Sequence, residues 1–145
     1  VDEAVEIRVL HPPEGQWTAV TPSDNATSVV LEVRYAGRRL LLTGDLEREG
    51  LSRLLAMPAR PIDVMLSPHH GSLAANPAAL GRWAKPATVV ASGGARIDRI
   101  TLTENYREQT RVLTTTTSGA VTIEIAPDGA LTSRTAFVDS EQSIP

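Results

Sequence analysis

The chain has 145 residues, enough to bury one core of ordinary size, and nothing in it calls for a second domain. Its formal net charge of -3 gives no basic field, so binding to nucleic acid would need a local patch or a bound cation. Cysteine is absent, which excludes disulfides and thiolate metal sites and leaves His, Asp and Glu as candidate metal ligands.

Strands dominate the first part of the chain. Val5–Leu10 is predicted to be a strand that ends at His11, because the two prolines that follow cannot extend a ladder. His11 has no nearby acidic or histidine partner in the sequence, so we expect it to be a surface residue at a strand end. The β-rich runs Thr27–Tyr35 and Arg39–Thr43 are joined by Ala36-Gly37, a turn short enough to predict a hairpin.

Two strand–loop–helix units follow the hairpin. In the first, a loop with Asp45 leads to a helix over Leu46–Ala56, whose leucines recur at helical spacing and whose first turn is acidic. In the second, the strand Ile62–Ser67 leads through a histidine-containing loop to a short helix near Pro77–Trp83 and then to a strand over Ala87–Ala91. Two consecutive units of this kind predict a partly parallel sheet.

The last part of the chain is again rich in strands. After the turn Ser92-Gly93-Gly94 we predict a short helix near Thr101–Arg107, followed by the strands Gln109–Leu113, Ala120–Ile125 and Ala130–Phe137. Asp128-Gly129 joins the last two as a hairpin. We expect one domain over residues 1–138 and a frayed tail over residues 139–145. The fold class is α/β, or α+β, with a mixed sheet and flanking helices.

Two polar motifs, Thr43-Gly44-Asp45 and Pro68-His69-His70-Gly71-Ser72, each follow an apolar strand. The carboxyl ends of parallel strands meet at one edge of a sheet, and ligands bind at that edge in open α/β folds. We therefore expect Asp45 to lie close to His69 and His70. A carboxylate beside imidazoles is the chemistry of a site for a divalent metal ion.

Each candidate residue also has a simpler structural interpretation. Asp45 fits the N-cap of the helix that follows it, and the two roles are compatible. His69 and His70 could form only a turn, since neighbours on a strand point to opposite faces of the sheet. Ser72 could cap a helix or position a substrate, and Ser92 begins a glycine-rich turn that relieves crowding near the site. Both serines stay candidate substrate-binding residues.

Four stretches together resemble the metallo-β-lactamase-type domain of ComEC, the competence DNA-internalisation family. They are Asn25-x-x-Ser28-x-Val30-Leu31, Leu40-Leu41-Leu42-Thr43-Gly44-Asp45-Leu46-Glu47, Asp63-Val64 and Pro68-His69-His70-Gly71-Ser72. The resemblance runs from roughly Val5 to Ile125. It implies a metallo-β-lactamase-like αββα sandwich of four layers, in which Asp45 bridges two metal ions and one of His69 and His70 binds one of them.

The chain departs from the family pattern in two places. It lacks the upstream His-x-His-x-Asp-His motif that supplies most of the ligands, so we expect only the C-terminal half of the domain. The segment Ala95–Ile100 stands where the family places Gly-His-Pro, so a substrate-side histidine is missing. Asp24 falls about where related metallohydrolases place another ligand histidine and is a weak ligand candidate, whereas Asp24-Asn25 by itself predicts a turn.

The resemblance implies a metal-dependent phosphodiesterase, nuclease-like, that uses zinc or manganese. Its substrate would be single-stranded DNA, the strand that a DNA-uptake channel does not import, or another phosphoester. Without the missing half we expect this chain to be inactive and to bind little or no metal. Two alternatives stay open: a free-standing hydrolase of the same fold that acts on another ester or phosphoester, and a degenerate, non-catalytic interaction module.

The resemblance also bears on location and partners. No run approaches the roughly 20 apolar residues of a membrane span, and the first residues lack the pattern of a secretion signal, so we expect a soluble fragment. The resemblance implies an extracytoplasmic domain of a bacterial inner-membrane protein. The missing N-terminal half would cover an apolar sheet face, so we expect the chain alone to self-associate or to be marginally stable.

Overall fold

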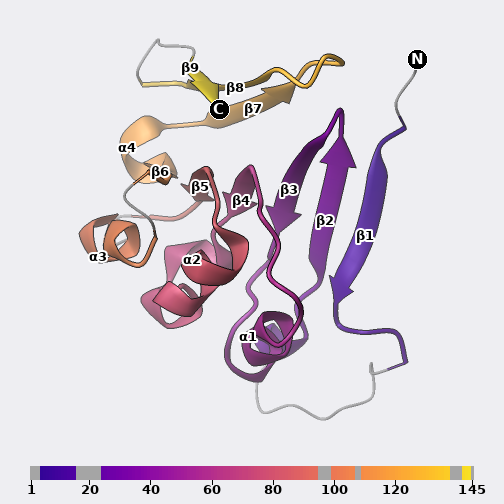
Figure 1. Ribbon diagram of the computed structural model, residues 1–145. Helices are drawn as coiled ribbons and strands as arrows, with labels where there is room; N and C mark the ends of the chain where they lie inside the picture. Colours follow the sequence, from indigo (N-terminus) through magenta and orange to yellow (C-terminus); the bar gives the residue numbers. More distant parts are fainter. Residues whose placement is uncertain (1–3, 16–23, 95–98, 107–108, 138–141, 145) are drawn as a thin grey trace.

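A six-stranded mixed sheet forms the centre of the computed structural model, which describes residues 4–15, 24–94, 99–106, 109–137 and 142–144 (Figure 1). The strands lie side by side in chain order: β1 (Glu6–His11), β2 (Val30–Tyr35), β3 (Arg38–Leu42), β4 (Val64–Leu66), β5 (Thr88–Ala91) and β6 (Arg111–Thr114). The first three pair antiparallel, whereas β3 to β6 pair in parallel. The predicted partly parallel sheet and the mixed α/β class are thereby confirmed.

The β2–β3 hairpin forms at the predicted turn. Ala36 and Gly37 have φ values of 47° and 76°, the left-handed values that suit a two-residue turn between twisted strands. Strand β2 begins at Val30 rather than at the predicted Thr27. The difference arises because Asp24–Thr27 form the short 3₁₀ helix η1, in which the Thr27 hydroxyl donates to the Asp24 carbonyl.

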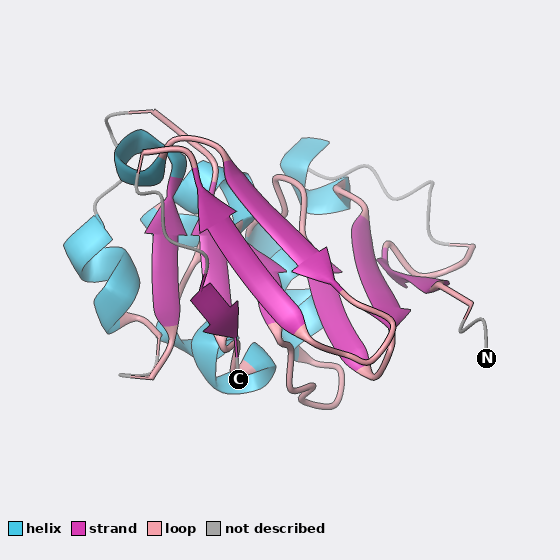
Figure 2. Ribbon diagram, turned by 90° about the horizontal axis from the view of Figure 1, so that it is seen from above, coloured by secondary structure: helices cyan, strands magenta, loops and turns pink. Residues whose placement is uncertain are grey.

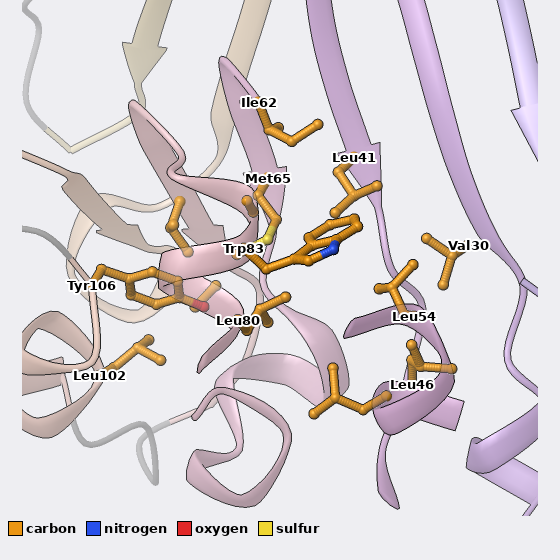
Figure 3. Packing of buried hydrophobic residues seen from close by; sticks show 14 of the residues in the cluster. Val30, Leu41, Leu46, Leu54, Ile62, Met65, Leu80, Trp83, Leu102 and Tyr106 are labelled. Carbon is orange, nitrogen blue, oxygen red and sulfur yellow. The ribbon is translucent and has the colours of Figure 1, made fainter. Parts of the chain in front are cut away.

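Three helices cover one face of the central sheet: α1 (Arg48–Leu55), α2 (Ala78–Ala84) and α3 (Arg99–Glu104). The helix-side core consists of strand residues that point toward these helices and of the helix residues that meet them, among them Leu41, Met65, Val89, Leu54, Leu80 and Trp83 (Figure 3). The Trp83 indole donates to the Met57 carbonyl at 2.9 Å, which ties α2 to the segment after α1. This core fixes the parallel strands whose ends carry the candidate site.

A second sheet covers part of the opposite face. It is three-stranded and antiparallel, with β7 (Val121–Ile125), β8 (Leu131–Thr135) and β9 (Gln142–Ile144) in that order, and the single turn α4 (Thr115–Ser118) precedes it. Strand residues Val64 and Val90 pack against Leu131 and Ile144 of this sheet. Figure 2 is seen from the side of the second sheet and shows most of the helices partly hidden behind the strands. The described residues therefore form three layers: helices, central sheet and second sheet.

The ends of several predicted elements need correction. The tail was expected to fray, but Gln142–Ile144 pair with β8 and Ile144 is buried, because a neighbouring strand can shelter its apolar side chain. The helix expected at Thr101–Arg107 is α3, which begins two residues earlier, and residues 107–108 lie outside the described part. None of the helices in the described ranges is long and apolar enough to cross a membrane.

Two apolar rows cross β1 to β3 on the face away from the helices. The register aligns Val9, Leu31 and Leu42 in one row and Ile7, Val33 and Leu40 in the other. Leu40 packs beneath the second sheet, whereas Ile7 and Val9 are 61% and 57% exposed. We call the uncovered part, Ile7, Val9, Leu31, Val33 and Leu42, the open face. The apolar sheet face expected from the sequence is therefore present, and self-association through it stays a prediction.

Candidate functional site

Three loops meet at the carboxyl edge of the parallel strands, as the sequence predicts. Asp45 follows β3, the histidine loop (Pro68–Ser72) follows β4, and Ser92 follows β5. Two hydrogen bonds join the first two loops: the Thr43 hydroxyl donates to the Leu66 carbonyl at 2.7 Å, and the His69 amide donates to the Gly44 carbonyl at 3.1 Å. The carboxylate and the histidines are thus brought together by two bonds to main-chain carbonyls.

Gly44 is required for this close approach. Its φ is +53°, and a Cβ at this position would lie 3.3 Å from the Val29 carbonyl oxygen. A larger residue would meet both a conformational cost and a steric one. The turn that presents Asp45 therefore depends on glycine.

Asp45 is not the N-cap that one interpretation of the sequence expected. Helix α1 begins at Arg48, its N-cap position is Glu47, and Glu47 makes no side-chain capping bond there. The helix begins later than predicted because Arg48 has a φ of 52° at its first position, so the chain between Asp45 and Arg48 is not helical. The Asp45 side chain is 44% exposed. Its position suits a ligand better than a cap.

His70 faces the Asp45 carboxylate. Its Nδ1 lies 2.8 Å from the Ser92 carbonyl oxygen, and because a carbonyl only accepts, Nδ1 carries the proton. In the neutral imidazole the lone pair is then on Nε2, which lies 3.5 Å from Asp45 Oδ1. A backbone carbonyl that fixes the tautomer in this way is the usual partner of a metal-binding histidine. The side chain is therefore oriented with its ligand atom toward a carboxylate.

His69 is directed elsewhere. Its Nδ1 lies 3.0 Å from Glu47 Oε2, and the other oxygen of Glu47 accepts from Asn25 at 3.4 Å and lies 3.6 Å from Arg48 Nε. The two imidazole rings are 6.3 Å apart and inclined by 63°. The sequence left open which histidine could be the ligand. The geometry favours His70, whereas His69 joins the histidine loop to the start of α1.

A pocket of about 250 Å³ opens beside this pair. Its walls are Gly44, Asp45, Leu66, Ser67, His70 and Ser92. The pocket has room for a cation with water or for a small group such as phosphate. Ser92 thus lies at the pocket, as its role as a substrate-binding candidate requires. Ser72 is not among the lining residues. It stands at the N-cap position of the 3₁₀ helix η3 (Leu73–Ala75) without a side-chain capping bond.

The pair fits a divalent cation in spacing but not in number of ligands. Two ligands at zinc-bond lengths and a tetrahedral angle stand about 3.3 Å apart, close to the 3.5 Å between His70 Nε2 and Asp45 Oδ1. Zinc sites use three or four protein ligands. Within the described residues no group of three or more His, Asp or Glu side chains could hold a metal ion. Other ligands would have to complete the shell.

Two other sequence candidates lie away from the pair. Asp24 is exposed in η1, which confirms its interpretation as part of a turn. His11 was expected at the surface but is 1% exposed, so that prediction is wrong. An irregularity in the β1 ladder between Val9 and His11 turns the imidazole inward, where Nδ1 donates to the Ser28 carbonyl at 3.0 Å. Neighbours in space, rather than in sequence, account for its burial.

Glu47, the partner of His69, is a residue of this site that no local pattern marks, although it ends the motif that contains Asp45.

No family model matches this chain, and no curated protein matches it.

Proposed function

We propose that this edge of the sheet is part of a metal-dependent phosphoester hydrolase site, with Asp45 and His70 as ligands of a divalent ion. One observation carries the proposal: His70 Nε2 faces Asp45 Oδ1 at 3.5 Å while the Ser92 carbonyl holds the opposite ring nitrogen. Zinc and manganese both accept imidazole and carboxylate ligands. The resemblance of the two motifs to the metallo-β-lactamase-type domain also supports a metal site at this edge of the sheet.

The side chains have separate tasks in this site. A divalent ion held there would polarise a phosphoryl oxygen and activate water for attack. Asp45 has two carboxylate oxygens, so it can bridge a second ion. The His70 imidazole gives one ligand atom and is kept in one tautomer by Ser92. Leu66 forms an apolar wall of the pocket beside Asp45. The substrate class we propose is a phosphodiester, with single-stranded DNA as the first candidate.

The site needs further ligands. If the chain is the C-terminal half of an αββα sandwich, the open face is the surface that a further layer would cover. We therefore propose that a protein segment or partner carrying the missing histidines completes both the layer and the metal shell. The resemblance to the ComEC family implies that the complete domain is extracytoplasmic and belongs to an inner-membrane DNA-uptake protein.

A non-catalytic interaction module is the second candidate. The observation that favours it is the number of ligands in the described part of the chain: Asp45 and His70 there fall short of the three or four that zinc sites use. A free-standing hydrolase of another ester would share the geometry of the first candidate and differ only in its substrate. Metal binding separates the module from both enzymes.

Calorimetric titration with zinc and manganese tests the proposal. We expect weak binding by the chain itself, lowered further in Asp45→Asn and His70→Ala and unchanged in His69→Ala. A complete domain should bind two ions and cleave single-stranded DNA with manganese, and Asp45→Asn should abolish cleavage. Equal binding by the chain and by its Asp45→Asn and His70→Ala variants would rule out the proposed ligands. A submicromolar site in the chain alone would instead contradict the need for further ligands.

A further inference from the structure

The histidine loop has an unfavourable backbone conformation. His69 and His70 have φ values of 47° and 55°, and Gly71 follows with 88°, so three successive residues are left-handed. For residues other than glycine this region is unfavourable, because Cβ crowds the following carbonyl oxygen. Such a conformation persists only where surrounding contacts determine it. The contacts that hold this loop therefore also determine where the His70 ring lies.

The Asn76 side chain is bonded to the residues on either side of the His69-His70-Gly71 segment. Its Nδ2 donates to the Pro68 carbonyl at 2.9 Å and to the Ser72 carbonyl at 2.7 Å, which are the first and last residues of the loop. Its Oδ1 accepts from the Ser67 hydroxyl at 2.7 Å and from the Tyr106 hydroxyl at 2.6 Å. Both donors and both acceptor positions of the amide are thus used, and Asn76 is 0% exposed.

The far end of this network is fixed in the helix-side core. Tyr106 is buried beside Leu102 (Figure 3). The Tyr106 phenol is protonated at neutral pH and can donate, and burial raises its pKa further. The Asn105 side chain donates to the Asn76 carbonyl at 3.0 Å, and a Cβ on Gly81 of α2 would lie 2.6 Å from the Asn105 carbonyl oxygen. The amide of Asn76 is therefore held by the segment that follows α3, which itself packs tightly on α2.

We infer that Asn76 is a positioning residue for the candidate site: its amide sets the conformation of the histidine loop and so directs His70 toward Asp45. Asn76 does not itself line the pocket, and its side chain bonds to Ser67, Pro68 and Ser72 rather than to Asp45 or His70. It therefore acts through the histidine loop and through Ser67, the residue before it. The consequence for metal binding rests on the proposed function. The consequence for the His70 ring does not, because it follows from the loop alone.

The test compares Asn76→Leu with the natural chain by imidazole nitrogen NMR. Leucine has a similar size but leaves the Pro68 and Ser72 carbonyls without their donor. In the natural chain we expect His70 to give one set of ring signals with the proton on Nδ1. In Asn76→Leu we expect averaging between the two tautomers. Manganese titration should show a loss of affinity of about 10–100-fold, the usual effect of removing a residue that supports a ligand.

Thr110→Val is the matched control, because it deletes another buried bond from a side chain to a carbonyl, that of Thr110 to Pro86 at 2.8 Å, away from the loop. The His70 signals should not change in the control. Unchanged His70 signals in folded Asn76→Leu, or equal changes in Thr110→Val, would overturn the inference.

Tyr106→Phe decides the matter if Asn76→Leu does not fold. It removes one donor to Asn76 Oδ1 and should produce part of the His70 averaging, and no change there would also overturn the inference. The two proposals fail in different ways. Altered His70 signals in Asn76→Leu, with manganese binding equal in the natural chain, Asp45→Asn and His70→Ala, would sustain the inference and defeat the proposed ligands. Unaltered signals, with manganese binding lowered in Asp45→Asn and His70→Ala, would do the reverse.

Discussion

The two faces of the central sheet are both apolar, but they differ in what covers them. On the helix side Leu41, Met65 and Val89 are fully buried beneath α1 and α2. On the other side the second sheet covers β4 and β5, while Ile7 and Val9 at the open face stay exposed. An apolar strand pattern thus shows which residues favour burial, and the difference between the faces shows where a further layer would fit.

Adjacent leucines on β3 test this difference most strongly. Leu41 points into the helix-side core and is 0% exposed, whereas Leu42 points to the open face and is 39% exposed. We expect Leu41→Ala to lower the free energy of unfolding by about 2–5 kcal/mol through lost burial and a cavity. Leu42→Ala should cost under about 1 kcal/mol. Urea unfolding measures both, and equal losses would break the comparison.

A pH series probes the helix-side core at Tyr106. Burial raises the pKa of Tyr106 above its ordinary value of 10.0. Above pH 10 the unfolded state therefore loses the phenol proton while the native state still keeps it. The stabilisation is complete below pH 10 and falls as pH rises above 10, by at most about 1.4 kcal/mol per pH unit. Tyr106→Phe should lack this part of the slope. Urea midpoints between pH 9 and pH 11 that run parallel for both proteins would show that the phenol is not sheltered.

Charge at the open face should change association more than stability. Ile7→Lys places an ammonium on the exposed edge strand β1, where it opposes contact with another apolar surface. We expect light scattering over a dilution series to show less self-association, with the free energy of unfolding altered by under about 0.5 kcal/mol. Arg134→Lys, on the second sheet and exposed, serves as the control. A natural chain that stays monomeric and binds no hydrophobic dye would contradict the prediction.

The smallest effect on stability is expected at Asp45, which lies at the carboxyl edge of the central sheet rather than on either face. Asp45 is not the N-cap residue of α1, so Asp45→Asn should change the free energy of unfolding by under about 0.5 kcal/mol, as ordinary surface substitutions do. The melting temperature should therefore change little. A large drop in the absence of metal would show that this carboxylate is structural and would argue against a ligand role.

Much of this architecture follows from local patterns. The hairpin at Ala36-Gly37 and the parallel strands β3 to β5 are predictable because turn residues and apolar runs mark them in the sequence. The nearness of Asp45 to His70 follows too, since the ends of neighbouring parallel strands share an edge. These are consequences of short stretches of chain and of sheet geometry.

Other features depend on contacts between distant residues. The sequence could not choose between His69 and His70, because the choice comes from Glu47 on one side and Ser92 on the other. Asn76 precedes a proline and looks like an ordinary loop residue, and its role depends on Tyr106, which is far along the chain. His11 is buried by a ladder irregularity that no local pattern marks.

The bond between the Thr43 hydroxyl and the Leu66 carbonyl has a consequence for ion size. Thr43 is 1% exposed, and its bond fixes β3 against the end of β4 just before the two loops diverge toward Asp45 and His70. The backbones that carry the two candidate ligands are therefore fixed relative to each other at the strand ends, and the side chains of Asp45 and His70 span the remaining distance. For any ion that these two side chains held, a fixed backbone spacing would favour the ion whose bond lengths match it over those that need a wider or narrower span.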